Sequence, residues 1–222
     1  MTTPDALAPS AASRRSGWLD LTAPLSGLLF VAFVVVLIIT GDGPGDTAGE
    51  VVAYVEDNSG AIAALGIFSL LSLIFLGAFV GGLFVRLQAV GARVEATFAL
   101  AAGAAFAVLF FVAMMLWYAP LIELDAEESS AVQTTQAETY LGIEDIGWFM
   151  LGGGGVAAGL MIIVASIGAR RGGLVPAWAG WLGVALGVIG LATVTFIGIL
   201  AWLLWIVLAS ILMLWPKRAT AT

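Results

Sequence analysis

The longest apolar stretch of the chain, residues 175–215, reads VPAWAGWLGVALGVIGLATVTFIGILAWLLWIVLASILMLW and contains no Asp, Glu, Lys or Arg. A single helix of this length, rising 1.5 Å per residue, would be about 60 Å long, roughly twice the thickness of a bilayer's hydrocarbon core. The stretch therefore predicts two membrane-spanning helices, at about 175–194 and 197–215. We expect the chain to reverse between Ala192 and Gly198, where the sequence ATVTFIG has two threonines and a glycine and no charge.

Four further apolar runs precede this stretch, each near the roughly 20 residues that cross a bilayer as a helix. They occupy residues 23–40, 60–85, 96–119 and 146–168, and none contains a charged residue. Of the whole chain, 61% is hydrophobic and only 10% is charged, whereas an ordinary soluble domain has about 25% charged residues. The predicted fold is therefore all-α, a polytopic membrane helix bundle with six transmembrane helices.

The six helices are expected to form one transmembrane domain over residues 17–218. Residues 1–16 are rich in Ala, Ser and Pro, and we expect them to form a disordered cytoplasmic tail. The first apolar run is longer than the roughly 7–15 apolar residues of a cleavable signal peptide, which favours a retained anchor.

The charged residues divide between the two sides that six spans would define. With the N-terminus inside, every cation falls on the cytoplasmic side, in agreement with the positive-inside rule. These cations are Arg14, Arg15, Arg86, Arg93, Arg170, Arg171, Lys217 and Arg218. Twelve of the 15 acidic residues fall on the other side, in acidic extracellular loops at 41–59 and 120–145. The sequence thus predicts a multi-pass protein of the cell membrane with both termini in the cytoplasm.

The tryptophan positions agree with this topology, because the indole ring prefers the headgroup level of a bilayer. The residues expected at the inner interface are Trp18, Trp178, Trp181 and Trp215, and those expected at the outer interface are Trp117 and Trp148. Trp202 and Trp205 are expected one or two helical turns below the outer surface.

Glycine is concentrated in the fourth apolar run, where residues 151–160 read LGGGGVAAGL. A phosphate loop of the Walker type needs a following Lys and Ser or Thr, and a dinucleotide loop needs a preceding strand, so neither motif fits this sequence. Small residues spaced by three or four let membrane helices approach closely, and we therefore expect packing seams of Gly and Ala. The predicted seam residues are Gly77, Gly81, Gly103, Gly155, Gly159, Gly180, Gly183, Gly187 and Gly190, with Ala99 and Ala107 beside Gly103. Local unwinding or a hinge at 152–155 is the alternative, because non-helical backbone is tolerated where it lines protein or a water-filled cavity.

The residue types that are missing exclude much chemistry. The chain has no His and no Cys, which excludes Ser–His dyads, imidazole metal sites, haem b ligation and thiol chemistry. No Asp, Glu, Lys or Arg lies inside a predicted span, which argues against a proton-coupled or ion-coupled pump. The sequence has no cofactor motif and no extended basic patch, so we expect no cofactor and no nucleic-acid partner. The ionisable groups that remain are carboxylates and phenols at the outer face.

Two similar acidic segments precede the second and fourth apolar runs, EVVAYVED at 50–57 and ETYLGIED at 138–145. Clustered carboxylates could gather a hard cation such as Ca²⁺ or Mg²⁺, which prefers several oxygen ligands. The candidate metal ligands are Glu50, Glu56, Asp57, Glu138, Glu144 and Asp145. The alternative is a solvated acidic rim, since charge runs usually form solvated faces.

The first acidic segment also contains a helix start. Thr47 followed by Glu50 has the spacing of a capping box and predicts that a short helix begins there. We expect Val51, Val52 and Val55 of this helix to lie on the membrane surface.

Two blocks carry a resemblance to a known group of proteins. AGEVVAYVEDNSG at 48–60 and RRGGLVPAWAGWLGVALGVIGL at 170–191 resemble the six-span membrane proteins of unknown function that are abundant in actinobacteria. The likeness extends over most of the chain after residue 20. It implies the same six-span fold and assigns no chemistry to any residue.

These observations favour a membrane protein without a catalytic site. We expect an accessory or interaction protein that acts through helix packing or its acidic outer cap, with the lipid bilayer and a homo-oligomer or another membrane protein as partners. One alternative is a small transporter or channel with a cation-attracting outer vestibule. A second alternative is a membrane enzyme that uses Glu138, Glu144 or Asp145 as acid and base at the outer interface.

Overall fold

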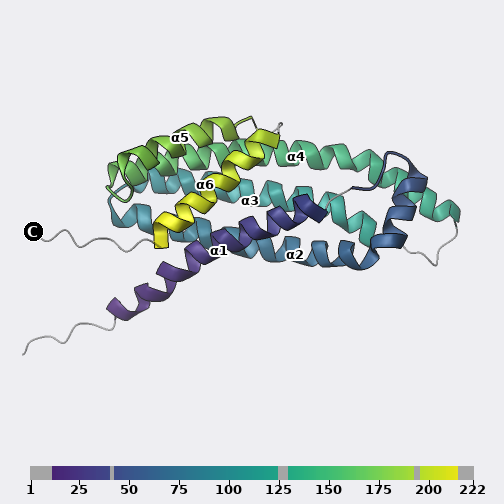
Figure 1. Ribbon diagram of the computed structural model, residues 1–222, viewed down its shortest axis with the longest axis horizontal. Coiled ribbons are helices and arrows are strands. Elements are labelled where there is room, and N and C mark those ends of the chain that lie inside the picture. Colours follow the sequence, from purple (N-terminus) through teal and green to yellow (C-terminus); the bar gives the residue numbers. More distant parts are fainter. Residues whose placement is uncertain (1–11, 41–42, 125–129, 193–195, 215–222) are drawn as a thin grey trace, which may run out of the picture.

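The computed structural model describes residues 12–40, 43–124, 130–192 and 196–214, and within these ranges the chain is helical, without strands (Figure 1). The helices are α1 (Ala12–Thr40), α2 (Ala48–Ala89), α3 (Arg93–Ile122), α4 (Ser130–Arg171), α5 (Ala177–Gly190) and α6 (Phe196–Leu214). Five of them are long and apolar enough to cross a membrane. The predicted all-α polytopic bundle is therefore confirmed.

The 175–215 stretch forms two helices, as its length predicts. These helices, α5 and α6, contact each other within the bundle. α5 has 14 residues and is thus about 21 Å long, which is shorter than the expected span of 175–194. It begins after Pro176, because the proline ring disfavours helical backbone at the residue before it. It ends in a turn where the N–H of Leu191 donates to the carbonyl of Gly187 (3.1 Å).

Successive helices run in opposite directions around a closed ring (Figure 1). Each helix contacts the next one along the chain, and α1 contacts α6, which closes the ring. α4 also contacts α2 and α6 across the ring. The start of α1 and the end of α6 lie at the same end of the bundle. The expected reversal between Ala192 and Gly198 joins α5 to α6, but its residues 193–195 lie outside the described ranges.

The described charged residues of the helix connections separate to the two ends of the bundle. The basic end contains the α2–α3 and α4–α5 turns, and its basic residues are Arg86, Arg93, Arg170 and Arg171. It also contains Glu95, whose carboxylate accepts a hydrogen bond from the Arg171 guanidinium (3.0 Å). The acidic end contains the α1–α2 connection, the end of α3 and the start of α4, and its residues are Asp46, Glu50, Glu56, Asp57, Glu123, Glu138, Glu144 and Asp145.

Two glycines close the turns at the basic end. Gly91 follows α2 with a φ of 79°, and Gly173 follows α4 with a φ of 67°, both in the left-handed region that favours glycine. After Gly91, the N–H of Ala92 donates back to the carbonyl of Leu87 (3.1 Å). After Gly173, the N–H of Leu174 donates in the same way to the carbonyl of Ala169 (2.8 Å). Both helices therefore end in a Schellman motif, which permits a short connection to the next helix.

The acidic segments are more helical than predicted. Most of 41–59 and of 130–145 is helix rather than loop, because α2 and α4 each extend to 42 residues. A straight helix of this length would be about 63 Å long, so these helices project well beyond a hydrocarbon core of about 30 Å. α2 starts with the predicted capping box: the Thr47 hydroxyl accepts from the Glu50 N–H (3.4 Å), and the Glu50 carboxylate accepts from the Thr47 N–H (3.1 Å).

A kink at Asn58 separates the first part of α2, residues 48–57, from the rest of the helix (Figure 1). Asn58 has non-helical dihedral angles (φ −127°, ψ 15°), and its side-chain amide donates to the carbonyl of Tyr54 (3.0 Å). We call residues 48–57 the cap segment, because they cover the acidic end of the core. The prediction that this segment lies on the membrane surface is wrong, since Val51 and Val55 are buried against the protein.

The glycine stripe of α5 packs against α4. A Cβ placed on Gly159 of α4 would lie 2.8 Å from the carbonyl oxygen of Gly187, and one placed on Gly187 would lie 2.9 Å from that of Gly159. The predicted close approach of two backbones is therefore present here. The other buried seam residues are Gly103, Gly155, Gly180, Gly183 and Gly190, with Ala99 and Ala107.

Two predicted seam residues face outwards instead. Gly77 and Gly81 of α2 have no atom within 4 Å of a Cβ placed on them. α2 approaches α1 through Gly82, where an added Cβ would collide with the Cβ of Ala23. The prediction that Gly77 and Gly81 pack against another helix of the same chain is thus wrong.

The four consecutive glycines of α4 do not interrupt the helix. α4 is helical through residues 152–155, so the alternative of local unwinding is wrong for this structure. A Cβ placed on Gly154 would lie 3.3 Å from the Cβ of Leu109 in α3. The glycine therefore lets α3 and α4 pack closely.

An aromatic layer crosses the interior of the bundle. Its ring centroids lie 5.1 to 6.5 Å apart, and its members are Phe30, Phe106, Phe110 and Trp202. Trp205 packs edge-on against Phe79 nearby (6.1 Å). Trp202 and Trp205 are 1% and 5% exposed, so both rings belong to the core of the bundle. Their expected depth, one or two helical turns below the outer surface, stays a prediction.

Candidate functional site

The six candidate metal ligands do not assemble into a metal site. Among the described residues, no group of three or more Asp or Glu side chains is placed to hold a metal ion. The Glu50 carboxylate is used in the capping box, where it accepts from both the backbone N–H and the hydroxyl of Thr47 (3.1 and 2.8 Å). Glu144 differs from the others because it lines a cavity. The structure therefore gives no support to a calcium or magnesium site.

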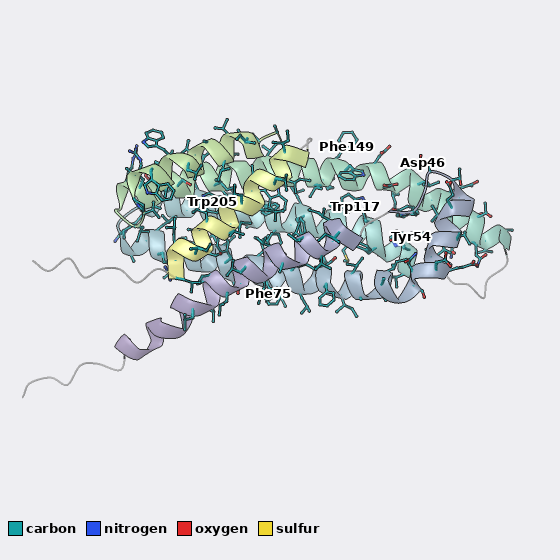
Figure 2. All side chains as sticks on the ribbon, viewed as in Figure 1. Asp46, Tyr54, Phe75, Trp117, Phe149 and Trp205 are labelled. Atoms are coloured by element: carbon teal, nitrogen blue, oxygen red, sulfur yellow. The ribbon has the colours of Figure 1, made fainter. Side chains whose placement is uncertain are left out.

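An aromatic pocket of about 290 Å³ lies at the acidic end. It is lined by α1, α3, α4, α6, the cap segment and the connection between α1 and α2. The lining residues with aromatic rings are Tyr54, Phe110, Trp117, Tyr118, Tyr140, Trp148 and Trp202. Glu144 is the one charged residue among the described lining residues, and the remaining ones are apolar. Figure 2 labels Tyr54 and Trp117, which mark this end of the bundle.

All three tyrosines of the chain line this pocket. Tyr54 belongs to the cap segment, which the kink at Asn58 turns across the end of the bundle. Tyr118 lies near the end of α3, and Tyr140 lies in the part of α4 that projects beyond the apolar run. Tyr118 and Tyr140 are 9% and 3% exposed. All three phenols and the Glu144 side chain line the same cavity, so they form one cluster.

Trp117 and Trp148 form one wall of the pocket. Their ring centroids are 4.8 Å apart, and their ring planes are inclined by 58°. The indole N–H of Trp117 donates to the backbone carbonyl of Glu144 (3.3 Å). Gly147 makes room for this bond, because a Cβ at that position would collide with the Trp117 ring. This contact fixes α3 and α4 relative to each other at the pocket.

The surroundings of Tyr140 raise the pKa of its phenol. This residue lies outside the membrane-spanning run, and burial together with the nearby Glu144 carboxylate raises the pKa of its phenol well above the ordinary value of 10.0. A phenol with such a pKa does not act as a general base near pH 7. Tyr140 is therefore suited to donating or accepting a hydrogen bond and to offering its ring as a contact surface.

Trp202 lines the pocket where it meets the aromatic layer. Its side chain is 1% exposed, and its indole N–H has no hydrogen-bond partner among the described residues. Leaving a buried donor without an acceptor costs about 1–3 kcal/mol. An acceptor atom of a bound molecule or a water would therefore stabilise this position.

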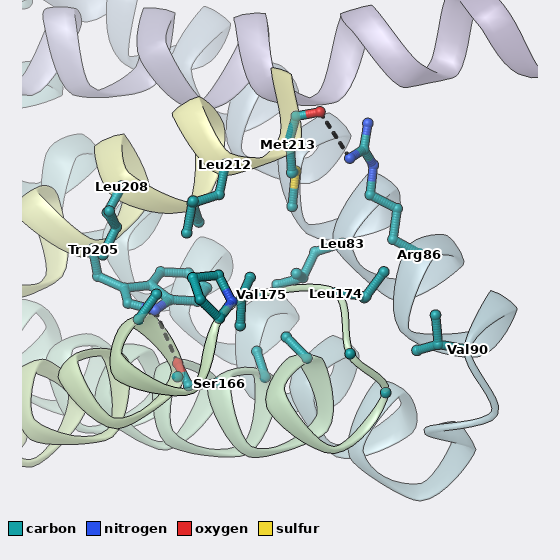
Figure 3. Close-up of a pocket in the computed structure, with 18 residues that line it drawn as sticks. Leu83, Arg86, Val90, Ser166, Leu174, Val175, Trp205, Leu208, Leu212 and Met213 are labelled. Carbon is teal, nitrogen blue, oxygen red and sulfur yellow. Dashed lines mark hydrogen bonds between the residues drawn. The ribbon is translucent and has the colours of Figure 1, made fainter. Parts of the chain in front are cut away.

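A larger cavity of about 610 Å³ lies at the basic end, between α2, α4, α5 and α6 (Figure 3). The Arg86 guanidinium donates to the carbonyl of Met213 (2.9 Å) in the last turn of α6, where a cation stabilises the helix C-terminus. The indole N–H of Trp205 donates to the hydroxyl of Ser166 (3.0 Å). The polar side chains of this cavity thus have structural roles, and we place the candidate functional site in the aromatic pocket.

The described lining of the aromatic pocket offers ring faces, hydrogen-bonding phenols and one negative charge. The expected acid–base set of Glu138, Glu144 and Asp145 is not brought together there, because Glu144 alone of the three lines the pocket. The arrangement is suited to holding a ligand.

Comparison with protein-family models, with curated proteins and with solved structures finds no match. The resemblance to six-span actinobacterial proteins therefore stays a prediction. The function has to be argued from the pocket itself.

The outer phenols are predicted from the sequence as available chemistry, whereas their meeting in one pocket is not. A signal was present: Tyr54 and Tyr140 each lie six residues before a predicted span, and Tyr118 lies at the end of another. All three are therefore expected at the same membrane face. The kink at Asn58, which directs Tyr54 to the pocket, has no comparable signal.

Proposed function

We propose that the chain is a non-catalytic binding protein of the cell membrane that takes up a small molecule in its aromatic pocket. The acidic end faces the outside, and the basic end and both termini face the cytoplasm, following the positive-inside rule. The interaction role expected from the sequence then resides in the outer cap.

One observation carries this proposal, the convergence of three phenols, several indoles and one carboxylate on a single cavity. Small-molecule sites are mostly apolar and aromatic, with a few placed polar groups. The volume of about 290 Å³ is near the lower limit of the roughly 300–1,000 Å³ that is usual for such sites. The buried Trp202 N–H without an acceptor supports the same reading.

Helix packing is the weaker basis for the interaction role. The glycine stripe of α5 is already occupied by α4, with Gly187 against Gly159. A dimer built on that stripe would require the two helices to separate first.

A transporter is the second candidate, and one observation favours it. The aromatic pocket and the larger cavity lie at opposite ends of the bundle and are lined by Trp202 and Trp205 of the same helix, α6. Movement of these rings would connect the two cavities. Flux of a bound compound into proteoliposomes would support transport, whereas binding without flux would leave the protein a receptor.

The test of the proposed function uses a matched pair of glycines. Gly43 lines the aromatic pocket and Gly49 does not, yet both are exposed and have no atom within 4 Å of an added Cβ. Gly43→Trp adds a large ring at the wall of the pocket, where the Cβ meets no other atom, and is expected to obstruct the pocket; Gly49→Trp is the control. The thermal midpoint of each detergent-purified protein is measured against a panel of small organic cations, anions and neutral alcohols.

A ligand that binds the folded state raises the midpoint by mass action. We expect at least one class of compound to raise the thermal midpoint of the wild type and of Gly49→Trp. The same compounds are expected to leave the midpoint of Gly43→Trp unchanged. A shift that persists in Gly43→Trp, or a panel without any shift, would contradict the proposal.

A further inference from the structure

We infer that the ligand of the aromatic pocket is an organic ammonium ion, either free in solution or part of a lipid headgroup. This inference rests on the proposed function, because it names the class of molecule that the same pocket takes. Three properties of the pocket lead to it: its charge, its aromatic lining and its buried indole donor.

Charge selects a cation over an anion. Glu144 is the one charged side chain among the described lining residues. The surrounding acidic end carries seven further described carboxylates, while the arginines of the α2–α3 and α4–α5 turns lie at the opposite end. A cleft lined by charge of one sign raises the local concentration of ions of the opposite sign. Anionic ligands would have to enter against this field.

The aromatic lining selects an organic cation over a metal ion. Seven described lining residues carry rings, and five of these are the Trp and Tyr side chains Tyr54, Trp117, Tyr118, Tyr140 and Trp148 outside the aromatic layer. A cation over such a ring gains a factor of about 2 to 30 in affinity, and sets of these rings recognise quaternary ammonium groups. Ca²⁺ and Mg²⁺ instead need about six oxygen ligands. The described residues contain no acidic cluster that could supply them.

Trp202, which lines the pocket, also has a buried donor that no described residue satisfies. The indole N–H of Trp202 is buried and has no acceptor in the described structure. An oxygen in the same ligand would accept this bond once the Trp202 ring turns its N–H towards the cavity. An amino alcohol or its ester has both features, and its small size suits a cavity of about 290 Å³.

Such a group has two sources, a free amino alcohol such as choline and the headgroup of an aminophospholipid. Both present an ammonium ion with an oxygen a few bonds away. The experiment therefore has one arm for each source.

The full-length protein is placed in nanodiscs of phosphatidylglycerol, which has no ammonium group, and titrated with choline by calorimetry. The matched neutral probe is 3,3-dimethyl-1-butanol, which has the shape of choline without its charge. A second set of nanodiscs contains phosphatidylethanolamine. We expect choline to bind, and the neutral probe to bind about tenfold more weakly or not at all.

Two variants test the groups that recognise the cation. Trp148 is 54% exposed, so Trp148→Leu removes a ring without opening the core. We expect it to weaken choline binding by about 2- to 30-fold. Glu144→Gln removes the charge and is expected to weaken binding by about tenfold or more. Trp178→Leu, at the basic end and 61% exposed, is the control with unchanged binding.

If choline binds more weakly in the nanodiscs with phosphatidylethanolamine, the lipid competes and the ligand is a lipid headgroup. If choline binds equally in both kinds of nanodisc, the ligand is a free ammonium compound. Equal binding of choline and the neutral probe, both lost in Gly43→Trp, would overturn the ammonium inference and leave the proposed function standing. Choline binding that survives in Gly43→Trp would overturn both. No choline binding together with no effect of phosphatidylethanolamine would also overturn the inference, and the compound panel would then decide the proposed function separately.

Discussion

The packing of α5 on α4 predicts that substitution by alanine has opposite effects on stability at two of the predicted seam glycines, Gly159 and Gly77. Gly159→Ala adds a Cβ 2.8 Å from the carbonyl oxygen of Gly187 and 3.0 Å from the backbone nitrogen of Leu191. Backbone atoms cannot rotate away, so the helices must separate. Gly77→Ala is the matched change, because a Cβ at Gly77 has nothing within 4 Å.

The size of the effect follows from the distances. Non-bonded heavy atoms pack at about 3.5 Å, so relieving a 2.8 Å contact needs a shift of about 0.7 Å. Each van der Waals contact between the helices contributes about 0.15 kcal/mol, and a gap of this size removes about a third of that energy. Over roughly 40 contacts, the loss in packing energy is about 2 kcal/mol. This value agrees with the roughly 1–3 kcal/mol that overpacking usually costs. Gly77→Ala is expected to stabilise the protein by up to about 1 kcal/mol, because alanine favours a helix over glycine.

The assay is equilibrium unfolding of both variants in mixed micelles with a denaturing detergent, followed by tryptophan fluorescence. We expect the free energies of unfolding of the two variants to differ by about 2–3 kcal/mol. Equal free energies would refute the close approach of α4 and α5. Destabilisation by Gly77→Ala would refute the assignment of Gly77 to an open face and would indicate that a second copy covers it.

Two further predictions concern the acidic end. Thr47→Ala removes the cap of α2 and is expected to lower the free energy of unfolding by about 1 kcal/mol. Thr139→Ala is the control with little expected change, because the exposed Thr139 hydroxyl donates only to the carbonyl of Thr135 in its own helix. Equal effects of the two substitutions would contradict the capping role of Thr47. Because the pKa of Tyr140 is raised on folding, the unfolded chain loses this proton first, so the stability is full below pH 10.0 and declines as the pH rises above that value. Unfolding measured against pH would show a smaller decline for Tyr140→Phe than for the wild type, and an unchanged decline would exclude Tyr140 as its source.

The helices themselves could be predicted because their signals are local. The length of the 175–215 run requires two helices, and the structure has two. The capping box at Thr47 and Glu50 depends on residues three positions apart, and it is present as predicted. The extension of α2 and α4 through acidic segments is not predicted, because charged residues indicate where a chain leaves the membrane but do not prevent a helix from continuing.

The side of each helix that packs against the protein interior could not be predicted. Gly81 and Gly82 are neighbours in sequence and about 100° apart around a helix, yet the second one meets α1 and the first does not. In a soluble protein, hydropathy would distinguish the two faces. In a membrane, lipid and protein interior are both apolar, so a helix carries no polar stripe to mark its outer side. The same reason explains why the burial of Trp202 and Trp205 in the core could not be predicted from the sequence.

The sequence by itself determined the number of helices, the positions of their charged ends and the types of side chain available at each end. These follow from the bilayer thickness, from backbone hydrogen bonding and from composition. Only the tertiary structure decided that Tyr54, Tyr118 and Tyr140 meet beside Glu144, whereas the other candidate carboxylates stay apart. That meeting depends on a kink at Asn58 and on which faces of α3 and α4 turn inwards. Both are set by packing between residues far apart in the chain, for which no local pattern exists.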